Sequence, residues 1–162
     1  MAVAGTAGAQ IPVGPETRVS TGPAGWPVQR GPSRVTALAS DGGFVVAWAS
    51  APFPPGGYDV FARRFSAAGI AVGAELIVNS YTTGTQDNPS IASDSGGNFI
   101  VVWTSSGQDG SDLGVFGQRF DASGARLGGE FRVNEATLGA QRSPSIAARS
   151  GEFVVAWATD VG

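Results

Sequence analysis

Short apolar runs separated by Gly-rich, polar segments recur along this chain at a regular interval. The most apolar run, Phe44–Trp48, returns as Phe99–Trp103 and again as Phe153–Trp157. A second pattern, Val60–Phe65, returns as Val115–Phe120. The interval between copies is about 55 residues. Self-similarity at a fixed period of this order is the sequence signature of a repeat architecture.

Two further segments share the same period. One begins with Glu, at Glu16–Ser20, Glu75–Asn79 and Glu130–Asn134. The other is a Pro-Ser pair that follows a Gln by three residues, at Pro32–Ser33, Pro89–Ser90 and Pro144–Ser145. Short segments of this kind, separated by turn residues, predict four strands in each unit. No segment has sustained helical periodicity, so the chain is predicted to be all-β.

The strand that carries Phe and Trp is apolar on both of its faces. In the first copy these faces are Phe44, Val46 and Trp48 on one side and Val45, Ala47 and Ala49 on the other. A strand that is buried on both faces needs a sheet on either side, and radially arranged blades supply this arrangement. The sequence therefore predicts β-propeller blades, each of them a four-stranded antiparallel sheet.

The remaining strands fit a gradient from the axis of such a propeller to its rim. The Pro-Ser strand is short and lined by small residues, which favours an inner position. The Glu strand alternates as an edge strand does. Its predicted inward residues are Phe131 and Val133, and its predicted outward residues are Glu130, Arg132 and Asn134.

The repeats also divide the chain into regions. Residues 1–15 are predicted to be a flexible N-terminal segment, either the remnant of a signal peptide that ends at Ala7–Ala9 or an ordinary Ala/Gly-rich start. Residues 16–162 are predicted to form the repeat domain, with units at about 16–74, 75–129 and 130–162, the last of them incomplete. Closed propellers have about four to eight blades. Either the chain is part of a longer propeller, or copies of it associate to complete a ring.

Composition narrows the chemistry that the chain can perform. Apolar residues make up 42% and charged residues 14% of the chain, with 25 Gly and 10 Pro, which favours a folded, turn-rich protein. The sequence contains neither Cys nor His, which excludes disulfides, thiolate or histidine zinc sites, and serine–histidine catalysis. A net charge of −3 does not favour binding to nucleic acid or to an anionic membrane, because both partners are negatively charged.

The stretch from Trp103 to Asp121 carries the pattern W-x-S-x-G-Q-D-G-S, followed by V-F-x-Q-R-F-D. This pattern resembles a tandem repeat of large bacterial proteins that are secreted or exposed on the cell surface, most of which have no assigned activity. The resemblance covers roughly Glu16 to the C-terminus. It implies an extracytoplasmic, non-enzymatic module for binding or scaffolding, with a protein or glycan as its ligand. The segment Ala51–Gly57 replaces the Gly-Gln-Asp-Gly-Ser loop in the first unit, so the loop's role is not shared by all units.

The tryptophans are the first candidates for ligand contact. Trp48, Trp103 and Trp157 recur in register, and one aromatic per blade is similar to the arrangement of propeller lectins. Packing between blades is favoured over sugar stacking, because each Trp ends a strand that is apolar on both faces. Trp26 lies between Gly25 and Pro27, outside the repeated pattern, and is the better candidate for a ligand contact.

The loop that contains Gln108, Asp109 and Asp112 is the second candidate ligand site. It has the oxygen-rich, Gly-containing look of a calcium loop but lacks the spacing and the distal Glu of an EF-hand. A solvated turn is favoured over a metal site there. No cofactor is predicted, and Asp109 and Asp112 are the weak candidates for calcium ligands.

The recurrent charged residues do not form a catalytic constellation. Arg64 and Arg119 recur beside Phe, and an Arg–Glu pair between adjacent strands or blades is the expected role for them. A glycosidase would need two carboxylates about 5 to 9 Å apart, whereas the recurrent acids are spread one per unit. No catalytic residue is therefore predicted. The alternatives to a binding module are a structural subunit of a larger homomeric or heteromeric assembly and, more remotely, a sialidase-like hydrolase, since Ser93–Gly96 faintly resembles an Asp-box turn.

Overall fold

The computed structural model describes residues 19–20, 29–51, 57–149 and 151–160. The predicted N-terminal segment 1–15, the candidate contact residue Trp26 and residues 52–56 of the Pro-rich loop lie outside this range.

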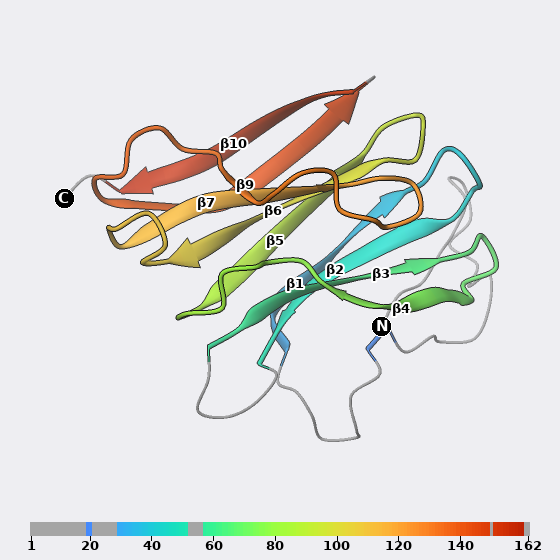
Figure 1. Ribbon diagram of the computed structural model, residues 1–162, viewed down its shortest axis with the longest axis horizontal. Coiled ribbons are helices and arrows are strands. Elements are labelled where there is room, and N and C mark those ends of the chain that lie inside the picture. Colours follow the sequence, from blue (N-terminus) through green and yellow to red (C-terminus); the bar gives the residue numbers. More distant parts are fainter. Residues whose placement is uncertain (1–18, 21–28, 52–56, 150, 161–162) are drawn as a thin grey trace, which may run out of the picture.

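The described residues contain strands and no helix, so the all-β prediction is confirmed. The strands, labelled in Figure 1, are β1 Gln29–Ala37, β2 Phe44–Ser50, β3 Asp59–Phe65, β4 Ala71–Ile77, β5 Gln86–Ser93, β6 Phe99–Ser106, β7 Leu113–Phe120, β8 Phe131–Arg132, β9 Ala140–Arg149 and β10 Glu152–Asp160. Each apolar run found in the sequence lies within one strand, because alternating β-branched and aromatic side chains suit a pleated, buried surface.

Each sheet is built from strands that follow one another in the chain. β1, β2, β3 and β4 form a four-stranded antiparallel sheet in that order. β5, β6, β7 and β8 repeat the same antiparallel order. The β9–β10 hairpin joins this second sheet through one parallel pair, Leu113 with Ala140. The described chain therefore forms two sheets, of which the first runs from Gln29 to Ile77, and it does not form a closed ring.

The two sheets share the same register as well as the same order. Trp48 lies opposite Phe61 in the β2–β3 pair, and Trp103 lies opposite Phe116 in the β6–β7 pair. At the other end of each pair a Phe faces a Phe, and the rings stack at centroid distances of 5.2 Å for Phe44–Phe65 and 4.9 Å for Phe99–Phe120. The repeated sequence thus specifies a repeated set of cross-strand contacts.

The Pro-Ser motif coincides with an irregularity in the first strand of each unit. The pairing of β5 shifts register between Asp87 and Ser90, and that of β9 shifts between Arg142 and Ser145. In these two strands the residue before the proline has a positive φ, 49° at Asn88 and 55° at Ser143. The Pro-Ser pair therefore marks a β-bulge, where the missing proline N–H costs no regular ladder hydrogen bond.

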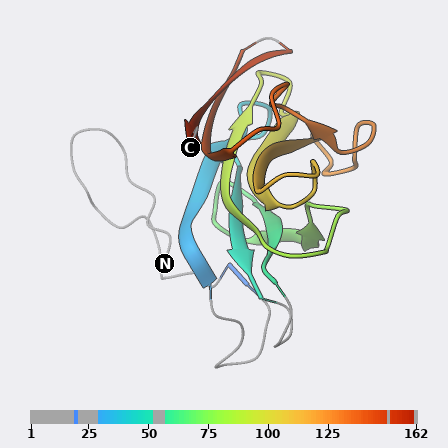
Figure 2. The ribbon, with the colours of Figure 1, turned by 90° about the vertical axis from the view of Figure 1, so that its left-hand side faces the viewer.

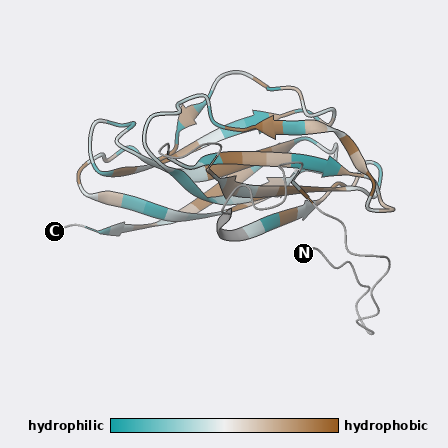
Figure 3. Ribbon diagram, turned by 90° about the horizontal axis from the view of Figure 1, so that it is seen from below, coloured by the Kyte–Doolittle hydropathy of each residue, from teal (hydrophilic) through white to brown (hydrophobic). Residues whose placement is uncertain are grey.

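The sheets stack face to face with β5–β7 in the middle. Figure 1 shows β1–β4 (blue to green) on one side and the β9–β10 hairpin (red) on the other, and Figure 2 shows the same order in the turned view. The first strands lie together, since β5 contacts both β1 and β9. Hydrophobic stretches run along the strands through the middle of the molecule (Figure 3).

The apolar contacts follow this stacking. The core between the first two sheets is Leu38, Val45, Ala47, Val60, Ala62, Val78, Ile91, Phe99, Val101, Trp103, Phe116 and Phe120. The opposite face of β5–β6 uses Ala92, Ile100 and Val102 to contact Phe131, Val133, Ile146, Ala148 and Val155. β6 is therefore buried on both of its faces, which is why its sequence lacks the polar alternation of a one-sided strand.

Candidate functional site

The loop between β6 and β7 contains the second candidate ligand site, and its side chains bind other parts of the chain. Gln108 donates a hydrogen bond from Nε2 to Oε1 of Glu130. The other carboxylate oxygen of Glu130 accepts from the N–H and the hydroxyl of Ser80, at 2.6 and 2.8 Å. Asp109 accepts from the N–H of Ser111 at 3.1 Å and from Nδ2 of Asn134 at 3.3 Å.

Asn134 is the centre of this network. Its Oδ1 accepts from the N–H of Val115 at 2.7 Å, and its Nδ2 also donates to the carbonyl of Ala136 and to Oε1 of Gln141. The prediction that Asn134 points outward is wrong, because its exposed fraction is 2%. Strand β8 ends at Arg132, so the alternation that places side chains inward and outward does not extend to Asn134.

The same arrangement occurs in the first sheet, just after the end of β4. Asn79 accepts from the N–H of Val60 at 2.7 Å and donates from Nδ2 to Asp59 at 2.7 Å and to the carbonyl of Tyr81 at 3.0 Å. The carboxylate that accepts from the Asn side chain comes from Asp59 on strand β3 in the first sheet. In the second sheet it comes from Asp109 in the loop between β6 and β7. Since buried polar groups are usually hydrogen-bonded, the recurrence of Asn79 and Asn134 in the sequence reflects this internal requirement.

The loop therefore offers little free ligating capacity. Both carboxylate oxygens of Asp109 already accept hydrogen bonds. Asp112 is exposed and takes part through its backbone carbonyl, which accepts from the N–H of Gly107 at 2.8 Å. Among the described residues, no group of three or more His, Cys, Asp or Glu side chains is placed to hold a metal ion. The structure brings Asp109 into the Asn134 network. Gln108 instead binds Glu130, and the side chain of Asp112 stays outside both sets of contacts.

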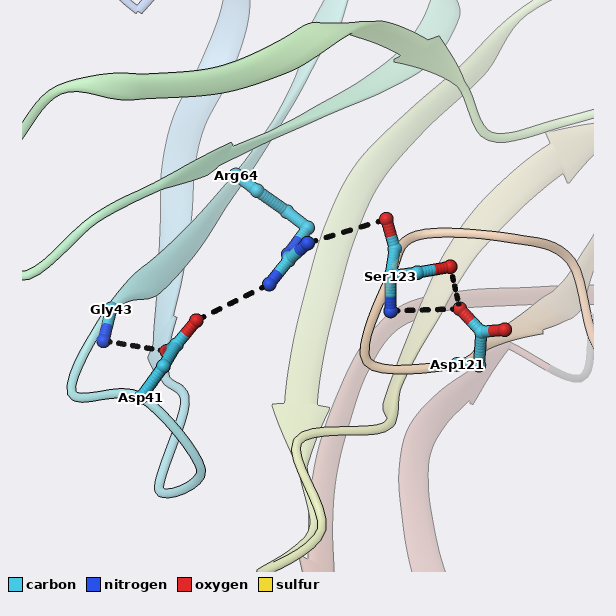
Figure 4. Close-up of polar contacts among 5 residues, drawn as sticks. All are labelled: Asp41, Gly43, Arg64, Asp121 and Ser123. Atoms are coloured by element: carbon cyan, nitrogen blue, oxygen red, sulfur yellow. Dashed lines mark hydrogen bonds and ion pairs between the residues drawn. The ribbon is translucent and has the colours of Figure 1, made fainter.

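Arg64 joins two sheets through a different pair of contacts (Figure 4). Its Nη2 lies 3.4 Å from Oδ2 of Asp41, and its Nη1 donates to the carbonyl of Ser123 at 3.3 Å. Asp41 also accepts from the N–H of Gly43 at 2.9 Å. The expected Arg–Glu pair is therefore wrong for Arg64, because the partner within reach is the carboxylate of the β2 turn.

The turn that contacts Arg64 is held in shape by Asp121. Its Oδ1 accepts hydrogen bonds from the hydroxyl of Ser123 at 2.6 Å, from the N–H of Ser123 at 2.8 Å and from the N–H of Ala125 at 2.9 Å. These bonds favour the charged carboxylate, and the Ser123 hydroxyl contributes most to holding the pKa of Asp121 below its ordinary value of 3.8. The carbonyl of Ser123 is thus presented to Arg64 by a preorganised turn.

Arg119 occupies in the second unit the position that Arg64 occupies in the first. It is exposed, and its guanidinium forms no hydrogen bond or ion pair with the described residues. It lines a cavity of about 160 Å³ between β6–β7 and the β9–β10 hairpin, together with Phe120, Leu127, Glu152 and Phe153. One repeated cation is therefore engaged between two units, and the other faces an open space.

Strand β10 is the second open feature. The repeated tryptophans of β2 and β6 are buried, with exposed fractions of 2% for Trp48 and 0% for Trp103, whereas Trp157 is 39% exposed. Val154, on the opposite face of the same strand, is 73% exposed. Within the described chain β10 pairs only with β9. Sequence reasoning did not connect β10 with Arg119, because the repeat pattern does not show which copies lie side by side.

The described residues contain no helix long and apolar enough to cross a membrane. No protein-family model and no curated protein matches the chain.

Proposed function

We propose that this chain is a non-enzymatic module of β-propeller type, secreted or exposed on the cell surface, that binds or scaffolds a partner through the open face of its last hairpin. The observation that carries the proposal is the 73% exposure of Val154 on β10. The corresponding face of β6 is covered by the β9–β10 hairpin, through Ile100 and Val102. The same strand face is therefore buried in β6 and exposed in β10. An exposed apolar face of this kind is suited to association with a protein.

The propeller assignment is supported by how the units are assembled. Four-stranded antiparallel meanders, first strands that lie side by side and sheets that stack face to face are the features of consecutive blades. The non-enzymatic assignment is supported by the chemistry of the recurrent polar residues. Asn79, Asn134 and Asp109 are engaged in hydrogen bonds within the chain, and none of these groups converges with a second acid in a cavity.

A protein partner fits this surface better than a glycan. The exposed face has an apolar centre, with Val154, Ala156 and Ala158 on β10 and Ala147 opposite Val154 on β9. Charged side chains lie toward its two ends, at Glu152 and Arg149 and at Arg142 and Asp160. Sugar recognition depends on polar side chains placed around an aromatic ring, whereas an apolar centre with charged residues at its rim is the kind of surface that protein interfaces bury. The same surface supports the second candidate function, a structural subunit whose copies stack into a larger assembly.

Sedimentation velocity over a concentration series tests the proposal. We expect the wild-type chain to associate beyond the monomer, and Val154→Arg to weaken this association, because a charge on the face would be desolvated on stacking. Ile70→Arg is the matched control, since Ile70 is 68% exposed and lies in the β3–β4 turn at the other side of the molecule. A wild-type chain that stays monomeric at all concentrations, or an equal effect of the two substitutions, would contradict the proposal.

A further inference from the structure

The strand that carries Trp has a characteristic partner in the first two units. β2 pairs along its whole length with β3, from Phe44 opposite Phe65 to Ser50 opposite Asp59. β6 pairs with β7 in the same way, from Phe99 opposite Phe120 to Ser106 opposite Leu113. β10 carries the same apolar pattern as β2 and β6 and has no such partner within the described chain. Its free edge therefore has the hydrogen-bonding row that β3 and β7 satisfy elsewhere.

The side chains of β10 are placed as this comparison requires. The ring of Phe153 lies 6.0 Å from that of Phe131, so Phe153 faces the second sheet, as Phe99 faces the first. Phe153 and Trp157 are each 39% exposed. In the paired units the equivalent aromatics are covered by the two Phe residues of the partner strand.

The cavity beside Arg119 lies where, between the first two sheets, the turn after β7 covers the equivalent residue Arg64. Between the first two sheets, the turn that follows β7 packs on Arg64 and accepts its hydrogen bond at the carbonyl of Ser123. An ideal Cβ at Gly124 would lie 3.6 Å from Cδ of Arg64 and 3.4 Å from Cδ1 of Leu76, so this turn contacts the neighbouring unit closely. The equivalent guanidinium of Arg119 lines a cavity of about 160 Å³ beside Phe153.

We propose that the free edge of β10 and the Arg119 cavity form one docking site for an extended segment of the third-strand type, with the turn that follows it. The segment has the pattern of Val115–Gly124, two Phe residues four apart followed by an Asp-x-Ser-Gly turn. It adds to β10 as an antiparallel strand, with main-chain hydrogen bonds for affinity and side chains for specificity. Its two Phe rings cover Trp157 and Phe153, and its turn carbonyl accepts from Arg119.

The occupant is a further repeat unit of this kind and not the β7 of a second folded copy. β7 is already paired with β6 on one edge and with β8 on the other, so a folded copy cannot donate it. The inference deepens the proposed function, because it names the partner that completes the last hairpin. It concerns the edge of β10, whereas the stacking tested with Val154 concerns the outer face.

A synthetic peptide with the sequence of residues 113–126 tests the inference directly. The peptide contains no Trp, so the tryptophan emission of the full chain reports on binding. We expect saturable binding with a blue shift of the emission as Trp157 leaves water. The shift should be lost in Trp157→Phe and kept in Trp103→Phe, which excludes exchange of the peptide for the chain's own β7.

Two variants distinguish the contribution of the β10 edge to peptide binding from the contribution of the Arg119 cavity. A peptide with Phe116→Ser and Phe120→Ser should not bind, since both rings that cover β10 are removed. Arg119→Gln in the chain should weaken binding by about five-fold, the order expected for loss of one hydrogen bond. Because Arg119 is exposed and has no partner among the described residues, this substitution leaves the fold intact.

Three results would overturn the inference: no saturable binding, equal binding of a scrambled peptide, or binding unaffected by Arg119→Gln. If the peptide fails while the wild-type chain associates in a Val154-dependent way, the docking site is wrong and the proposed function stands. If the peptide binds while the wild-type chain stays monomeric, the docking site stands and face stacking is wrong.

Discussion

The side-chain carbonyl of Asn134 accepts a hydrogen bond from the backbone N–H of Val115 at 2.7 Å, across 19 residues of chain. Asn134→Ala removes this acceptor and leaves a buried N–H without a partner. We expect the free energy of unfolding to fall by about 2 kcal/mol, measured by urea denaturation. Asn134→Asp keeps the acceptor oxygen but turns the Nδ2 donor into an oxygen that faces Asp109 and the carbonyl of Ala136, so it should lose at least as much. The exposed neighbour Glu135 provides the control, as Glu135→Ala should stay within about 0.5 kcal/mol of wild type.

The repeated tryptophans should differ in their contribution to stability. Trp103 is fully buried, so Trp103→Ala should lower the free energy of unfolding by about 3–5 kcal/mol. Trp157→Ala should cost only about 1 kcal/mol, because much of the Trp157 surface already contacts water. Denaturant titrations of both variants give the comparison. Equal losses would mean that β10 is covered in solution.

Gly117 allows the closest approach of β8 to β7. A Cβ at this position would lie 2.9 Å from Cζ of Phe131 and 3.2 Å from Cγ1 of Val102. Gly117→Ala should therefore destabilise the chain by about 1–3 kcal/mol, the usual cost of overpacking. A Cβ at Gly129 would meet no atom within 4 Å, so Gly129→Ala is the matched control and should be near neutral in a thermal melt.

The turn at Asp121 should make stability depend on pH in the acid range. Because the folded state lowers the pKa of Asp121, this group contributes stability that is fully present above its ordinary value of 3.8 and lost as pH falls through the folded value. The difference in stability between wild type and Asp121→Asn should accordingly shrink below pH 3.8. Ser123→Ala removes the hydroxyl that lowers the pKa most, so it should move the loss to higher pH. Denaturation curves at a series of acidic pH values measure both effects.

Calcium should have little effect on the chain. Both oxygens of Asp109 accept internal hydrogen bonds, so a calcium ion would have to displace Ser111 and Asn134. Millimolar calcium should shift the melting temperature by no more than about one or two degrees, since stabilisation follows RT ln(1 + [L]/Kd) and the expected Kd is high. A large rise that a chelator reverses would show that the loop rearranges to bind the ion.

The strands and their roles could be predicted because the repeat samples each position two or three times. β10 is a largely exposed edge strand, so the prediction of burial on both faces is wrong for the copy Phe153–Trp157. Phe44–Trp48 and Phe99–Trp103 have the same apolar pattern, and for them it predicts a buried strand correctly. This placed β2 and β6 at the centre of their sheets. The register was not predicted, although the two Phe residues of each third strand meet the Phe and Trp of the second strand in both sheets.

The polar network could not be predicted from the same patterns. Asp109 and Asn134 lie 25 residues apart in the sequence, and their approach depends on where β8 ends and the chain turns inward. The contact between Arg64 and Asp41 likewise depends on a turn whose conformation the alternation of side chains does not describe. The periodicity of apolar residues predicts which face of a strand is buried. Beyond the end of a strand, the conformation of the loop determines where a side chain points.

Among the residues that the structure describes, the apolar contacts between the first two sheets come from the strands of those sheets and from residues next to them. A duplication of one unit of about 55 residues therefore copies both sides of such a contact at once. Unequal recombination that inserts or deletes a whole unit leaves each remaining unit with a neighbour that already fits it. Arrays of different lengths can arise in this way without compensating substitutions.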